Sequence, residues 1–153
     1  MGGQLIIIRQ EDGKEVKLNG GFFSARLNRY HSNWLPCEGE ALGIKLVLEH
    51  FAPYIRESIH QSQHFTDSLP CVHAFKRARK GAFSTSVRIA TFLTSVSNLN
   101  VDIIHTAGKQ LKIVDYVSRH PSICENKKCQ ICKFTQQQVH IGDNATAIKA
   151  ITA

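Results

Sequence analysis

Three acidic residues stand at positions where a carboxylate is costly unless it binds a cation. Glu40 lies four residues before Ile44, so on a helix it shares the apolar stripe of that residue and should point toward a sheet instead of open water. Asp67 ends a short predicted strand, at the kind of sheet edge where ligand sites gather. Asp115 lies beside Val114 on the last predicted helix. An unpaired buried carboxylate costs several kcal/mol, and a bound metal ion is the usual remedy.

Each of these acids also has an ordinary structural explanation. Glu40 could simply occupy the first turn of a helix, where the helix dipole favours acids, and Glu38 competes for its role with a worse helical phase. Asp67 could begin a turn before Pro70, and Asp115 could be a half-exposed surface acid. None of the three is diagnostic alone.

Basic residues gather in one stretch of the chain. No acid occurs between Asp67 and Asp102, and the stretch carries five cations that we predict to bind nucleic acid: Lys76, Arg77, Arg79, Lys80 and Arg88. With a net charge of +7, this distribution favours a polyanionic partner. A solvated basic helix face or a nuclear localisation motif would explain the same residues.

A third set of residues could bind zinc. His120, Cys124, Cys129 and Cys132 have the spacing H-x3-C-x4-C-x2-C, which could wrap a tetrahedral zinc ion; reduced thiols are the alternative. The chain has five cysteines, an odd number with three close to the end, which is untypical of a secreted disulfide framework. We therefore expect an intracellular, reducing location.

The elements that would position these residues follow from periodicity and turn residues. Strands are predicted at 5–9, at 15–18 after the hairpin turn Asp12-Gly13, and at 22–27 after a second turn at 19–21. Helices are predicted at 36–53, 70–79 and 110–119, and short strands at 64–67 and 101–105. A further helix that ends at about 96 could be capped by Ser84, Thr85 or Ser86. This order indicates an α/β fold with a mixed sheet flanked by helices. The composition shifts after His120, so we predict a domain over 1–121 and a cysteine-containing tail or linker over 122–153.

Taken together, three segments resemble a known family. The strings CEGEALGIKLVLEHFAPYI, FTDSLPCVHAF and IIHTAGKQLKIVDYVSRHP resemble the ribonuclease H domain of long-terminal-repeat retrotransposon polyproteins of the gypsy-like and BEL-like groups, over roughly residues 20–121. Position by position, the resemblance assigns Glu40, Asp67 and Asp115 as catalytic metal ligands.

The resemblance implies a specific chemistry and specific partners. Two Mg²⁺ ions about 3.5–4 Å apart would cleave the RNA strand of an RNA–DNA hybrid during reverse transcription. The basic stretch would hold the duplex through its phosphates. The implied partners are the reverse transcriptase and integrase regions of the same polyprotein.

One expected residue is not found. The first strand of the family is central in the sheet and carries a further aspartate that bridges both metals, whereas the acids before Glu38 are Glu11, Asp12 and Glu15, of which the first two lie in a hairpin turn. We therefore expect the central strand to be missing and cleavage of hybrids to be impaired in this chain. The alternative hypotheses are a non-catalytic nucleic-acid-binding remnant and a zinc-bearing interaction module in the tail.

Overall fold

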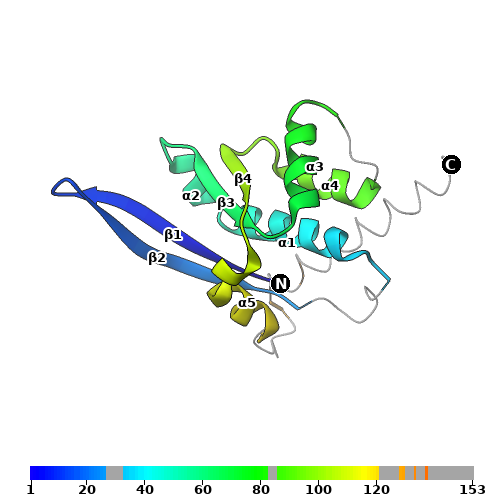
Figure 1. Ribbon diagram of the computed structural model, residues 1–153, viewed down its shortest axis with the longest axis horizontal. Coiled ribbons are helices and arrows are strands. Elements are labelled where there is room, and N and C mark those ends of the chain that lie inside the picture. Colours follow the sequence, from blue (N-terminus) through cyan, green and yellow to red (C-terminus); the bar gives the residue numbers. More distant parts are fainter. Residues whose placement is uncertain (27–32, 83–85, 121–127, 130–132, 134–136, 138–153) are drawn as a thin grey trace.

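The computed structural model describes residues 1–26, 33–82 and 86–120, together with 128, 129, 133 and 137 (Figure 1). In chain order the elements are β1 (Gly2–Glu11), β2 (Lys14–Ser24), α1 (Pro36–His50), α2 (Ala52–Glu57), β3 (Ser62–Thr66), α3 (Leu69–Arg79), α4 (Val87–Val96), β4 (Val101–His105), the short 3₁₀ helix η2 (Gly108–Gln110) and α5 (Lys112–Arg119). The described residues therefore form a mixed α/β fold, as the sequence predicts.

Strands β1 and β2 form a long antiparallel hairpin. Its turn is Asp12-Gly13, where both residues have positive φ, as a two-residue hairpin turn requires. The second turn predicted at 19–21 is wrong. Leu5 pairs with Gly21 and Ile6 with Asn19, so Gly20 is an extra residue in a bulge and β2 continues to Ser24 without a break.

Helices α1, α3 and α4 enclose the core, in which the largest fully buried side chains include Phe75, Phe92, Leu42, Leu46 and Leu93. Helix α1 begins at Pro36, where proline's missing N–H costs nothing, and it ends at His50. A further short helix, α2, begins immediately after Phe51 and contains Pro53 in its first turn, where the sequence predicts only a helix end.

Strands β3 and β4 pair in parallel, with α3 and α4 between them in the chain. The prediction of one mixed sheet is not met in the described residues, which form two separate sheets, β1–β2 and β3–β4. In this part of the chain, each of the four strands pairs with one strand only. The physical reason is that, among the described residues, no backbone hydrogen bonds join a strand of one sheet to a strand of the other.

The two ends of the hairpin have different surroundings. Its base, near the N-terminus, packs against α5, while its turn extends away from the helices (Figure 1). Gly3 lies directly against α1, because a Cβ added there would stand 2.5 Å from a methyl group of Val47. Toward the turn, Ile6 and Ile8 are 52% and 58% exposed. The hairpin is therefore fixed to the body only at its base.

Candidate nucleic-acid interface and carboxylate positions

Asp67 lies where the parallel strands end. The residue before it, Thr66, closes β3, and its carbonyl oxygen accepts a hydrogen bond of 2.8 Å from the backbone N–H of Thr106, which follows β4. A Cβ added at Gly108 would come within 3.0 Å of Oδ2 of Asp67, so the loop after β4 lies against this exposed carboxylate. The structure thus places Asp67 at the sheet edge where α/β folds bind ligands, as predicted.

Glu40 does not have the predicted surroundings. Its side chain is exposed, whereas Glu38, the competitor with the worse phase, is buried at 8% exposure. The reason is that the carboxylate of Glu38 accepts hydrogen bonds from the backbone N–H of Leu35 at 3.1 Å and from the side chains of Ser86 and Arg88, each at 2.9 Å. The buried carboxylate of α1 is therefore neutralised by an arginine of this chain.

The first turns of α1 and α3 adjoin each other. The thiol of Cys71 donates a hydrogen bond of 3.4 Å to the backbone carbonyl oxygen of Cys37. Burial raises the pKa of Cys71 to about 11, and the negative charge of Glu40 acts in the same direction. Glu40 therefore lies within electrostatic range of the start of α3, and Asp67 lies just before that helix.

Asp115 is placed differently from the other two acids. It is exposed on α5, and its Oδ1 accepts a hydrogen bond of 2.9 Å from Nε of Arg119, one turn later on the same helix. Within the part of the chain that the structure describes, no three acidic, histidine or cysteine side chains lie close enough together to hold a metal ion. Glu40, Asp67 and Asp115 are thus not gathered into such a group among the described residues.

The five predicted nucleic-acid-binding cations divide into two groups. Arg88 pairs with buried Glu38 and lies over the ring of Trp34, its guanidinium carbon 4.6 Å from the ring centroid. Arg79 donates a hydrogen bond of 2.9 Å to the backbone oxygen of Val101, which ties α3 to β4. Each of these two arginines therefore connects two elements of the fold: Arg88 joins α4 to α1, and Arg79 joins α3 to β4.

The other three cations are available to a ligand. Lys76, Arg77 and Lys80 are exposed at the C-terminal end of α3. Because the negative end of the helix dipole lies there, cations are stabilised at these positions. We call these three residues the α3 cluster.

Two of the four predicted zinc ligands lie beyond the described residues. Cys124 and Cys132 lie outside them, so the structure does not test the four-residue site. His120 is exposed at the end of α5, and its Nδ1 is 2.9 Å from the carbonyl oxygen of Tyr116. A histidine whose Nδ1–H donates to a carbonyl leaves Nε2 for a metal, so this geometry is compatible with a zinc ligand.

One contact of Glu38 is predictable from the sequence but was missed. Glu38 stands at the third position of α1, counted from Pro36, and a glutamate there commonly caps the helix through the backbone N–H before the first turn. The capping pattern predicts the hydrogen bond to Leu35, but the contact with Arg88 depends on tertiary packing.

Comparisons of this chain with protein-family models, with curated proteins and with solved structures found no match. Among the described residues, no helix is both long enough and apolar enough to span a membrane.

Proposed function

We propose that this chain is a ribonuclease H-like domain of a retroelement polyprotein, and that its function is to bind nucleic acid. The three segments that resemble the family support this assignment, as does the order of hairpin, helix, parallel strand pair and final helix. The observation that carries the binding function is the α3 cluster, Lys76, Arg77 and Lys80, exposed in a stretch without acids from 68 to 101. Phosphate contacts of this kind give affinity without reading sequence.

Cleavage of the RNA strand requires metal-binding carboxylates in addition to binding of the hybrid. Two-metal hydrolysis needs carboxylates that share two ions, and the aspartate that would bridge both ions has no counterpart among the acids before Glu38. We therefore expect this chain to bind hybrids without cleaving them at ordinary enzyme rates. Glu40 on α1, Asp67 directly after β3 and Asp115 on α5 remain the residues that the resemblance assigns as metal ligands.

Charge reversal tests the binding function. We expect Lys76→Glu, Arg77→Glu and Lys80→Glu, combined in one variant, to weaken binding of a labelled RNA–DNA hybrid in fluorescence anisotropy. The dependence of log K on log salt should become shallower by about one unit for each phosphate that the variant no longer neutralises. A matched control reverses three exposed cations of the hairpin, Arg9, Lys14 and Lys17, and should bind almost as the unmodified chain does. Equal reductions of affinity in the two triple variants would contradict a role for the α3 cluster.

The same hybrid tests the catalytic part of the proposal. Incubation with Mg²⁺ should leave the labelled RNA strand intact over times in which an active ribonuclease H would degrade it. Metal-dependent cleavage that is abolished by Asp67→Asn would show that the carboxylates do converge, and it would overturn this part of the proposal while leaving the binding function in place.

A further inference from the structure

Helix α5 has one face packed on the hairpin and another that faces solvent. The hydroxyl of Ser24 donates a hydrogen bond of 3.1 Å to the carbonyl oxygen of Val117, and a Cβ added at Gly2 would meet backbone atoms of Val114 and Ser118 at 3.0 and 2.9 Å. Because successive residues of a helix are about 100° apart, residues 112, 116 and 120 form a stripe roughly opposite 114 and 118. This stripe consists of Lys112, Tyr116 and His120, and all three are exposed.

The stripe presents an ordered aromatic surface. The rings of Tyr116 and His120 are stacked, with centroids 4.3 Å apart and an angle of 23° between their planes. The contact of 2.9 Å between Nδ1 of His120 and the carbonyl oxygen of Tyr116 fixes the imidazole in this position. Tyr116 is nevertheless 63% exposed, and its neighbour Ile113 is 57% exposed. Two pre-ordered flat rings with much apolar surface in water are suited to stacking with a third flat group.

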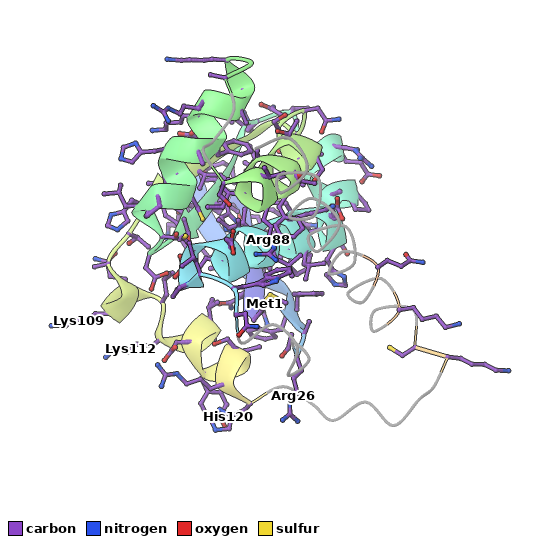
Figure 2. The ribbon with its side chains drawn as sticks, turned by 90° about the vertical axis from the view of Figure 1, so that its right-hand side faces the viewer. Met1, Arg26, Arg88, Lys109, Lys112 and His120 are labelled. Atoms are coloured by element: carbon purple, nitrogen blue, oxygen red, sulfur yellow. The ribbon has the colours of Figure 1, made fainter. Side chains whose placement is uncertain are left out.

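Cations lie on α5 and on the neighbouring segments. Lys109 and Lys112 project from η2 and α5, and Arg26 projects from the segment after β2 on the same side as His120 (Figure 2). The one acid between 103 and 124 is Asp115, whose charge is already paired with Arg119. Asp67 also lies against Gly108, next to Lys109. The cations Lys109, Lys112, Arg26 and Arg119 outnumber the two acids Asp67 and Asp115, so the net charge of these residues is positive and favours a ligand that carries both negative charge and flat rings.

We propose that this face of α5 binds single-stranded nucleic acid, with one base stacked on Tyr116 and the neighbouring phosphates held by Lys109 and Lys112. Bases of a duplex are already stacked on each other inside the helix, so an aromatic platform selects unpaired bases. The inference rests on the proposed binding of nucleic acid and adds a second site to it, separate in sequence from the α3 cluster.

The test measures binding of fluorescein-labelled single strands of about twelve nucleotides, oligo(U) and oligo(dT) in separate arms, by anisotropy. Tyr116→Ala should weaken binding about fivefold to 150-fold, since stacking on an aromatic residue contributes about 1–3 kcal/mol per base and 1.4 kcal/mol is a factor of ten. Tyr116→Phe should bind as the unmodified chain does because it keeps the ring. Tyr54→Ala removes a tyrosine of α2 that is 53% exposed, and it serves as the matched control. Lys109→Ala with Lys112→Ala should make the dependence of log K on log salt shallower by about 1.4 units, since each phosphate contact with a single strand contributes about 0.7.

Two results would overturn the inference: unchanged affinity of Tyr116→Ala, or the same weakening in Tyr54→Ala. A hybrid without single-stranded ends separates this inference from the proposed function. If the hybrid binds through the α3 cluster and single strands do not bind, only the α5 site is wrong. If neither ligand binds, the proposed function is wrong as well. Tighter binding of oligo(U) than of oligo(dT) would show contacts to the 2′-hydroxyl groups and would support RNA as the ligand.

Discussion

The guanidinium of Arg88, on α4, donates a hydrogen bond of 2.9 Å to the carboxylate of Glu38, on the first turn of α1, and both side chains are nearly buried, at 14% and 10% exposure. Arg88 lies 50 residues after Glu38 in the chain, and Ser86, which also donates a hydrogen bond to Glu38, lies 48 residues after it. These contacts join α1 to the start of α4. Stacking of Arg88 on Trp34 covers the pair from one side. A buried carboxylate in this chain thus serves to hold helices together.

Removing one partner of this pair should destabilise the domain strongly. We expect Glu38→Gln to lower the free energy of unfolding by about 3 kcal/mol, because it leaves the buried charge of Arg88 without its counter-ion. Urea denaturation followed by circular dichroism measures the change. Glu40→Gln is the matched control: the same substitution two residues later, at an exposed position, should change stability by less than about 0.5 kcal/mol. Equal effects of the two substitutions would contradict the burial difference between these glutamates.

The same carboxylate should make stability depend on acid pH. Burial alone would raise the pKa of Glu38, but hydrogen bonds from Ser86, Leu35 and Arg88 and the charge of Arg88 together lower it below the ordinary value of 4.5. Because the folded-state pKa is the lower one, the contribution of ionised Glu38 is complete above about pH 4.5 and is lost as the pH falls through the folded-state pKa.

This dependence is measured as the difference in unfolding free energy between the unmodified chain and Glu38→Gln. The difference should be constant above about pH 5 and should shrink below about pH 4, where protonation removes the charge that the substitution also removes. A difference that stays the same down to about pH 3 would show that the carboxyl is not held ionised by its partners.

His64, on β3, should add a pH dependence in a higher range. Its side chain is half-buried on the strand face that includes buried Thr66, and burial lowers its pKa from 6.5 to about 4. Between these two values the unfolded chain binds a proton that the folded chain does not, so stability falls as the pH decreases from 6.5 to 4, by at most about 1.4 kcal/mol per pH unit. His64→Leu should flatten this part of the stability profile. His60→Leu, at an exposed position, should leave it unchanged.

Local patterns predict much of the fold. Pro36 correctly marks the start of α1, Asp12-Gly13 the hairpin turn, and Ser86, one of three candidates, is the residue that caps α4. The turn predicted at Asn19-Gly20-Gly21 is wrong because the same glycines suit a bulge as well as a turn, and only the pairing with Leu5 and Ile6 distinguishes the two.

The candidate site is predictable only in part, because it depends on how separate elements pack. Asp67 can be placed from its strand and from the helix that follows it. The burial of Glu38 cannot, because it depends on Arg88, which lies 50 residues away in the chain. The apolar stripe that contains Ile44 does not predict which glutamate is buried either. Helix α1 is buried on most sides between Ala41 and Leu48, so its apolar residues do not define one inward face.

Two glycine-to-alanine substitutions of opposite expected sign test how the hairpin meets α1. At Gly3 a Cβ would stand 2.5 and 2.8 Å from the two methyl carbons of Val47, and valine in a helix has one preferred rotamer, so the strand must move. We expect Gly3→Ala to destabilise the domain by about 1–3 kcal/mol. At Gly39, within α1, a Cβ would meet nothing within 4 Å, and alanine should stabilise the helix by about 1 kcal/mol. Urea denaturation of both variants measures the two changes, and a Gly3→Ala chain as stable as the unmodified one would contradict close packing of β1 on α1.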